Sequence, residues 1–342
     1  MSSLTRFLCG LSLSVLLPSL PVSAQPPSGP GEKTLPKLSI GDPAPPIHIR
    51  TWVKGTPVKE LAKGKVYVID FWATWCIPCV TSMPQTTKLQ RRFQGKGLVV
   101  IGVTSTDSFG NTEDAIRRLV ERKGAGIGFA VGIDEPGASR KAYQGVFRGR
   151  TIQAYLRGTA EPSLPAAFVI DRQGRLAFIG HPLEIDNAVE KCLEGTWDLR
   201  AARKQRAARL RAEELLIELE TALKAKDSAR GMDLCRQLVD EVPHTNARVF
   251  GTVAHLMTEG ATPLVSQDPD LALKAARRAV KLTKGTDPDS VGVLARVHFG
   301  RGEIDKAVET MTKAVSLSEG SLKKELMKEL ETFRAAPGRK PE

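Results

Sequence analysis

The most informative segment of this 342-residue chain reads Asp70-Phe71-Trp72-Ala73-Thr74-Trp75-Cys76-Ile77-Pro78-Cys79. It continues a β-branched and aromatic run from Val66, which is typical of a buried strand, and it precedes a helical pattern over 80–94. Cys76 is therefore predicted to lie between a strand and a helix, where free backbone N–H groups and the helix macrodipole favour a thiolate. Because the thiolate is the nucleophilic form of cysteine, we expect Cys76 to be reactive near neutral pH.

Two residues separate the cysteines, so Cys79 can reach back to Cys76 within one helical turn. A C-x-x-C pair can also bind zinc or attach haem. Zinc sites usually need a second cysteine pair or suitably spaced histidines, and haem attachment needs a histidine where this chain has Val80. A purely structural disulfide would need neither the surrounding aromatic residues nor the acid on the preceding strand. The pattern therefore favours a redox-active pair.

Alternating strand and helix patterns continue on the C-terminal side of this segment. Strands are predicted at 97–104, 128–133, 168–171 and 176–179, and helices at 112–123, 137–144 and 185–193. Such alternation implies a mixed sheet that helices cover on both faces.

The cysteine segment resembles the active-site segment of thioredoxins, and it is most similar to exported TlpA/ResA-type and redoxin (AhpC/TSA-like) proteins. Gly41-Asp42-Pro43-Ala44-Pro45 resembles the entry motif of these proteins, residues 164–174 resemble their cis-proline loop, strand and hairpin, and residues 179–182 their next strand and turn. The resemblance covers about 40–198. It implies an α/β thioredoxin-like fold, a mixed central sheet flanked by helices, in which 145–159 would be an inserted loop near the site.

The resemblance also implies roles for individual residues. Pro165 would be a cis proline that faces the cysteines, and backbone groups of Leu164 would pair with the substrate chain. Asp70 matches the buried acid of thioredoxins, and burial should raise its pKa toward the range of a general base for Cys79. Further substrate contacts are expected from the side chains beside the nucleophile, namely Trp75, Ile77 and Pro78.

Two positions depart from relatives of this type. ResA-like proteins carry a glutamate three residues after the second cysteine, where this chain has Ser82. Peroxiredoxins carry a threonine three residues before the peroxidatic cysteine, where this chain has Ala73. The acid–base arrangement therefore resembles thioredoxin more than ResA, and the peroxidase route is disfavoured.

The N-terminus has the pattern of an export signal. A short n-region containing Arg6 precedes an apolar stretch at 8–17, and Val22-Ser23-Ala24 offers a cleavage site after Ala24. We expect a signal peptide at 1–24, a flexible linker at 25–39 and an exported, periplasmic or extracytoplasmic protein in an oxidising compartment. The alternative is an uncleaved membrane anchor.

A second domain, predicted to be an all-α helical repeat, occupies 199–342. Small residues recur with a spacing close to the 34-residue period of tetratricopeptide repeats, which the region resembles in a degenerate form. The functional interpretation is a surface for a peptide or protein partner, and the alternative is a packing or dimerising domain. The repeated positions are Gly231, Cys235 and Leu238, then Ala272, Ala276 and Ala279, then Ala307, Met311 and Ala314.

The net charge, the histidines and the remaining cysteines exclude few classes of function. The formal net charge is +12, and the densest basic run, Arg200–Arg211, is interpreted as the solvated face of a helix. It lacks interleaved aromatics, so we expect no nucleic-acid partner. The five histidines lack ligand spacing, so we expect no metal. Cys192 and Cys235 are interpreted as inert core thiols, and a bridge between them is the less favoured alternative.

These observations predict a thiol–disulfide oxidoreductase that acts on the thiols and disulfides of exported proteins and receives electrons from an unidentified donor. No cofactor is expected besides the Cys76–Cys79 disulfide. The alternatives are a redoxin-type thiol peroxidase and a partner-binding scaffold with an accessory redox domain. Both the direction of exchange and the oligomeric state stay open.

Overall fold

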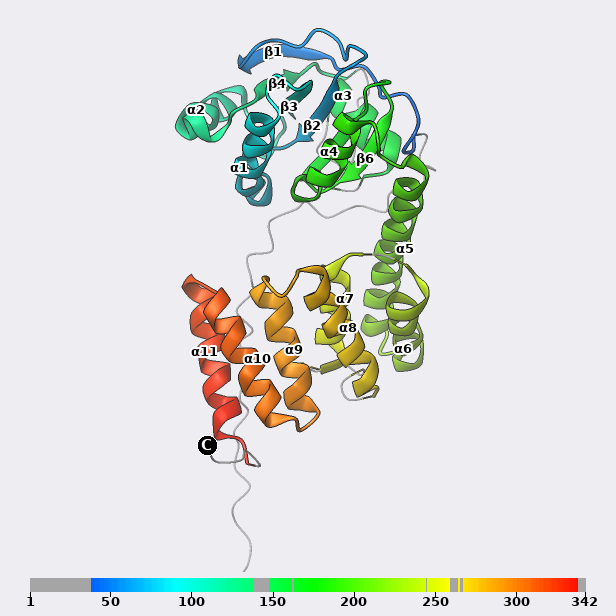
Figure 1. Cartoon of the computed structure of the whole chain (residues 1–342), viewed down its shortest axis with the longest axis vertical. Helices are drawn as coiled ribbons and strands as arrows, with labels where there is room; N and C mark the ends of the chain where they lie inside the picture. Colours follow the sequence, from blue (N-terminus) through cyan, green and yellow to red (C-terminus); the bar gives the residue numbers. More distant parts are fainter. Residues whose placement is uncertain are drawn as a thin grey trace, which may run out of the picture. The chain divides into compact units, whose positions relative to one another are not determined.

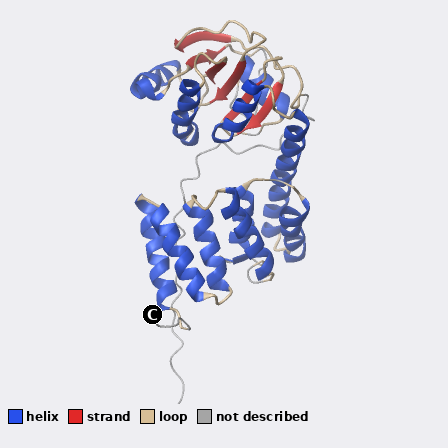
Figure 2. Cartoon of the chain, viewed as in Figure 1, coloured by secondary structure: helices blue, strands red, loops and turns tan. Residues whose placement is uncertain are grey.

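A computed structural model describes residues 38–137, 148–161, 163–243, 245–258, 264 and 267–337. The expected signal peptide, almost all of the expected linker and all but the first residue of the expected helix 137–144 lie outside the described residues. The chain forms two compact units that divide between Trp197 and Asp198. Strands occur in the first unit, and the described part of the second unit consists of helices and loops (Figure 2).

The first unit is built on a six-stranded mixed sheet with the order β1-β4-β3-β2-β5-β6 (Figure 1). The parallel strands β2, β3 and β4 lie together, whereas β1, β5 and β6 pair antiparallel to their neighbours. This arrangement confirms the thioredoxin-like α/β fold. The edge strand β1 was not predicted from the sequence. The strands span Ile49–Lys54 (β1), Val66–Phe71 (β2), Leu98–Thr104 (β3), Ala130–Asp134 (β4), Ala166–Ile170 (β5) and Leu176–Gly180 (β6).

The register of the central strands brings distant segments of the chain to one place. Asp70 in β2 lies opposite Gly102 in β3 and opposite Ala167 in β5. Because β5 runs antiparallel to β2, the segment before Ala166 lies beside the end of β2 that leads to the cysteines. The sheet therefore places the loop of Pro165 at the same end as Cys76.

Two helices share the face of the sheet that carries Asp70. Helices α1 (Ile77–Arg92) and α4 (Asp186–Glu194) lie side by side (Figure 1). Gln85 Nε2 of α1 donates to Asp186 Oδ2 of α4 at 2.7 Å. Helix α2 (Glu113–Lys123) lies near β1, and Arg50 of β1 donates to the Glu113 carboxylate at 2.8 Å. The expected alternation of strands and covering helices is thus present.

The described part of the inserted loop expected at 145–159, residues 148–159, forms a helical segment, and 145–147 lie outside the described residues. Helix α3 (Arg150–Ile152) continues into a π-helical turn, Gln153–Arg157. The ring of Tyr155 contacts Phe71 and Phe168 on the opposite side of β2 and β5 from Asp70, with ring centroids 5.5 and 5.1 Å apart. Its hydroxyl donates to Pro45 O at 2.7 Å, so this segment completes the core on that face.

Asp134 at the end of β4 holds the start of this segment. Its carboxylate accepts the N–H groups of Thr151 at 3.0 Å and Ile152 at 2.8 Å. Gly149 makes this approach possible, because a Cβ there would lie 2.1 Å from Asp134 Oδ2. Burial raises the pKa of Asp134, and the backbone hydrogen bonds oppose that shift.

The second unit is a row of helices in which neighbours along the chain pack against each other (Figure 1). Aspartate N-caps begin several of them, including Asp198, Asp227, Asp268 and Asp287. The helices are α5 (Leu199–Lys224), α6 (Ser228–Arg236) with a π-helical turn (Gln237–Glu241), α7 (Ala247–Thr258), α8 (Pro269–Leu282), α9 (Pro288–Gly300), α10 (Ile304–Leu317) and α11 (Gly320–Ala335).

All nine repeated small positions named above are buried in this helical unit. The assignment to tetratricopeptide repeats stays a prediction. The basic run on α5 is not a uniformly solvated face as expected, because Arg206 is only 7% exposed among packed helices. Within the described residues, none of the helices is both long and apolar enough to cross a membrane.

Candidate active site

Cys76 and Cys79 form a disulfide at the start of α1, with their sulfur atoms 2.02 Å apart and their Cα atoms 5.3 Å apart. Both residues are almost completely buried. The two residues between them are exposed, and the side chain of Ile77 is 69% accessible. The segment between the cysteines is therefore accessible, while the cysteines themselves are covered.

The helix begins three residues earlier than the sequence pattern predicted, because Cys76 itself is the N-cap of α1. Its Sγ accepts the backbone N–H of Cys79 at 3.3 Å, and Pro78 occupies the first turn, where a missing N–H does no harm. A sulfur at this position would also be stabilised as an anion by the helix macrodipole. The geometry thus favours a thiolate at Cys76 after reduction.

Asp70 is a buried carboxyl on β2. The Thr86 hydroxyl of α1 donates to Asp70 Oδ2 at 3.4 Å. Burial raises the pKa of Asp70 to about 7, and the hydrogen bond from Thr86 lowers it slightly against that trend. The carboxyl can therefore change its protonation state near neutral pH.

The loop before β5 contains a cis peptide bond between Leu164 and Pro165. Leu164 is buried, and Pro165 is half-buried. Ser82, the residue at the position of the ResA glutamate, is buried, and its hydroxyl donates to Cys79 O at 2.9 Å. Ser82 therefore contacts the backbone of the second cysteine but brings no titratable group to it.

A loop after β3 braces the segment before Cys76, and the sequence analysis did not identify it. The fully buried amide of Asn111 accepts the Thr74 N–H at 2.8 Å and donates to Thr104 Oγ1 at 2.9 Å and to Ser105 O at 2.6 Å. The Asp107 carboxylate accepts the indole N–H of Trp75 at 2.7 Å. The clustering of Asp107, Asn111 and Thr112 after a predicted strand was the available signal.

Three large apolar side chains are exposed on the described part of the redox unit, and each belongs to a segment next to the disulfide. Ile77 lies between the cysteines. Phe109, at 50% exposure, belongs to the loop that holds Trp75, and Leu183, at 56%, belongs to the turn after β6 that contacts α1. Each of these exposed apolar side chains therefore belongs to a segment that adjoins the start of α1 or the residues before Cys76.

The other cysteines of the described chain are free and buried, and they lie in different units. Burial raises the pKa of Cys192 to about 12, and the nearby Asp171 carboxylate adds to the increase. Burial likewise raises the pKa of Cys235 to about 12. Neither thiol would be ionised near neutral pH, which fits the interpretation of both as inert core residues.

The AhpC/TSA family model matches residues 40–179, which include both cysteines and the cis-proline loop. Protein FixW of Rhizobium leguminosarum is 27% identical over 172 residues, covering 49% of this chain and 72% of FixW. The thiol-disulfide oxidoreductase ResA of Bacillus thuringiensis subsp. konkukian is 30% identical over 141 residues, covering 41% of this chain and 68% of ResA.

Among solved structures, a putative thiol:disulfide interchange protein DsbE from Chlorobium tepidum is 24% identical with a TM-score of 0.34, covering 46% of this chain and 99% of that protein. The identity to ResA extends over two thirds of the length of ResA, and the cysteine pair lies at the start of α1. Together these two observations establish the family. The chain belongs, through its first unit, to the thioredoxin-like thiol-disulfide oxidoreductases of the AhpC/TSA family.

Proposed function

We propose that this protein exchanges dithiols for disulfides in exported proteins, with Cys76 as the nucleophile and Cys79 as the resolving cysteine. The observation that carries the assignment is the hydrogen bond from the Cys79 N–H to Cys76 Sγ at the N-cap of α1. Relatives named thiol-disulfide oxidoreductases support the reaction class. The disulfide is proposed to be the sole redox group.

In the reducing direction, the Cys76 thiolate attacks one sulfur of a substrate disulfide. A mixed disulfide forms, and the other substrate sulfur leaves as a thiolate that takes up a proton. Cys79 then loses its proton and attacks Cys76 Sγ. This step forms the intramolecular disulfide and releases the second substrate sulfur as a thiolate, so the substrate gains two electrons and the enzyme loses two. A donor dithiol must then reduce the Cys76–Cys79 pair.

We assign the proton from Cys79 to Asp70. Its pKa of about 7 suits a group that must accept a proton near neutral pH. Ser82 at the position of the ResA glutamate leaves Asp70 as the acid that the sequence and the burial support for this role. Trp75, Ile77, Pro78 and Leu164 are proposed to contact the substrate chain beside the disulfide, and Pro165 to face the cysteines.

The proposed substrates are proteins and not small polar thiols. A small disulfide needs access only to the sulfur atoms, whereas Ile77, Phe109 and Leu183 offer exposed apolar surface around them. The apolar N-terminal stretch supports an exported protein, and an oxidising compartment would supply disulfide-bonded substrates. A thiol peroxidase is disfavoured by Ala73 in place of the expected threonine.

Trapping experiments test the assignment. Cys79→Ser should accumulate mixed disulfides with a disulfide-bonded protein such as insulin, because resolution is removed. Cys76→Ser should neither reduce insulin nor form these adducts, while Cys235→Ser, which removes a buried thiol from the other unit, should form none and reduce insulin normally. Adducts formed by the Cys76→Ser protein would exchange the roles of the two cysteines. The absence of adducts from the Cys79→Ser protein would refute both roles.

A further inference from the structure

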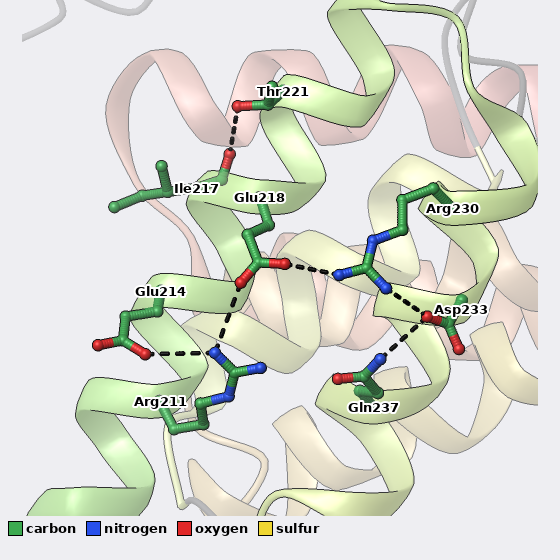
Figure 3. A network of polar contacts seen from close by, with 8 residues as sticks. All are labelled: Arg211, Glu214, Ile217, Glu218, Thr221, Arg230, Asp233 and Gln237. Carbon is green, nitrogen blue, oxygen red and sulfur yellow. Dashed lines mark hydrogen bonds and ion pairs between the residues drawn. The ribbon is translucent and has the colours of Figure 1, made fainter.

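Charged side chains on the facing surfaces of α5 and α6 neutralise one another in a network of ion pairs (Figure 3). Arg211 lies 3.3 Å from the Glu214 carboxylate and 3.5 Å from that of Glu218. Glu218 contacts Arg230 at 2.7 Å, and Arg230 contacts Asp233 at 2.7 Å. Cations and carboxylates alternate along this network, so it presents little net charge to a partner.

Helix α8 departs from this pattern. Four cations, Lys274, Arg277, Arg278 and Lys281, follow each other at helical spacing on its exposed face, and the helix has no acid after Asp270. Lys274 pairs with Asp240 at 2.6 Å, and Asp270 is paired with Arg301 of α9 at 2.7 Å. Among the described residues, no carboxylate lies within ion-pair distance of Arg277, Arg278 or Lys281. We call these three residues and Lys274 the α8 ridge.

Two members of the α8 ridge are held in place. The Arg278 guanidinium donates to Val239 O and lies over the Phe250 ring, 5.2 Å from its centroid. Lys274 is fixed by its ion pair with Asp240. Because these side chains are already ordered, a ligand that contacts them loses little further conformational entropy on binding. Arg278 is therefore both positioned and without a carboxylate partner among the described residues.

A hollow of about 380 Å³ runs along the α8 ridge. It is lined by the four cations, by Asp270 and by the buried Leu273. From Lys274 to Lys281 the helix rises about 10 Å, which an extended peptide spans in about three to four residues. Alternate side chains of such a peptide point to the same face, so two carboxylates can reach the ridge from one short segment.

We propose that the α8 ridge is a binding site for an acidic, extended polypeptide segment of a partner protein. The helical unit exposes no aromatic side chain within its described part, which disfavours nucleic acid, since single-stranded binding relies on stacking. Leu282 is the one exposed large apolar residue on α8, so the ridge lacks the apolar face that insertion into a membrane surface requires. The proposal does not depend on the redox chemistry of the first unit.

The test uses the full chain and a fluorescein-labelled peptide of about ten residues with glutamate at alternate positions. Fluorescence anisotropy should show binding that weakens with added salt. The double variant R277Q/K281Q should weaken binding at least ~10-fold, because two charge-assisted contacts are lost. The matched control R211Q/K224Q removes the same charge from the self-neutralised α5 surface and should change the affinity less than ~2-fold. Both variants should reduce insulin like the wild type.

Four outcomes would overturn the proposal. Absence of peptide binding would show that the α8 ridge is not such a site. An equal loss of affinity in both double variants would show that binding responds to net charge alone. Tighter, ridge-dependent binding of duplex DNA or of vesicles of phosphatidylglycerol would assign the ridge to a different class of partner. A peptide with glutamine in place of glutamate should not bind, and its binding would exclude recognition by charge.

Discussion

The indole N–H of Trp75 donates to Asp107 Oδ2 at 2.7 Å, although the two residues are 32 positions apart. The other carboxylate oxygen accepts the Phe109 N–H at 2.7 Å and the Asn111 N–H at 3.1 Å. One carboxylate thus fixes the aromatic ring beside the nucleophile and the loop tip that carries an exposed phenylalanine. This arrangement links the shape of the proposed substrate surface to the position of Cys76.

Asp107→Ala should slow the reduction of insulin about threefold to tenfold, the equivalent of one lost hydrogen bond of about 1 kcal/mol. The Trp75 ring and the Phe109 loop lose their common acceptor, so KM should change more than kcat. Steady-state insulin reduction measures the effect, and a small aromatic disulfide serves as the second substrate. Thr81→Ala, which removes an exposed hydroxyl bound to Ile77 O within α1, is the control. Equal losses on both substrates would place Asp107 in the chemistry and not in the substrate surface.

Phe109→Ser should raise the KM for protein disulfides severalfold and leave single-turnover reduction of the small disulfide unchanged. The reason is that Phe109 offers apolar area to a protein and makes no contact with the sulfurs in the proposed scheme. Ile217→Ser changes a comparably exposed apolar residue on α5 and should affect neither substrate. An unchanged KM for insulin in the Phe109 variant would contradict the proposed apolar surface.

Asp70→Asn should slow resolution of the mixed disulfide and abolish the rate inflection near pH 7 that the Asp70 carboxyl would give. Rapid mixing with a disulfide substrate across pH 5–9 measures it. Thr86→Val provides the companion variant. Its hydroxyl lowers the pKa of Asp70, so its loss should move the inflection to higher pH while the rate persists. Superimposable profiles for all three proteins would leave Asp70 with a structural role.

The same carboxyl should affect stability. Its pKa rises from an ordinary 3.8 to about 7 on folding, so its stabilising contribution is present below about pH 4 and is lost as pH rises through 7. The complete loss is on the order of 4 kcal/mol. In urea denaturation, the stability of Asp70→Asn relative to wild type should therefore increase progressively from about pH 4 to pH 7 and stay constant above it. A constant difference between the proteins from pH 4 to pH 8 would contradict the raised pKa.

Gly149→Ala should destabilise the redox unit by about 2 kcal/mol or more, because the new Cβ would overlap the Asp134 carboxylate that caps α3. Gly126→Ala is the control, since a Cβ at Gly126 would meet nothing within 4 Å. Thermal unfolding of both variants measures the difference. Equal melting temperatures would show that the Asp134 contact does not hold the 148–159 segment.

Residues 25–198, expressed alone, should fold and reduce small disulfides at the rate of the full chain. They contain the complete sheet and every residue assigned to the redox site, and the Trp197 indole N–H is tied to Ala177 O at 2.8 Å within the same unit. Circular dichroism and single-turnover kinetics provide the measurements. A folded fragment that cannot reduce a small disulfide would show that the helical unit contributes to the chemistry.

Much of the redox site follows from residues that are adjacent along the chain. A strand, a tight turn and a helix start are local structures, so the quoted segment around Cys76 was enough to predict a redox-active cysteine pair and to select Asp70 as a candidate without tertiary information. The pattern after Asp171 likewise predicted the β5–β6 hairpin. The sequence pattern placed the start of α1 three residues too late. Cysteine is not a usual N-cap, and Pro78 interrupts the helical pattern in the first turn.

The contacts that brace and surround the site were decided by tertiary structure. Asp107 reaches Trp75, and Asp134 holds the 148–159 segment, only because the sheet brings the ends of β3, β4 and the cysteine loop together. Charge was decided in the same way. The densest basic run lies on α5, where Arg209 and Arg211 are paired with glutamates, whereas Arg277, Arg278 and Lys281 of α8 have no carboxylate of the described residues within ion-pair distance. Sequence alone fixes which residues are charged, but their neutralisation depends on the carboxylates that packing places within a few ångströms.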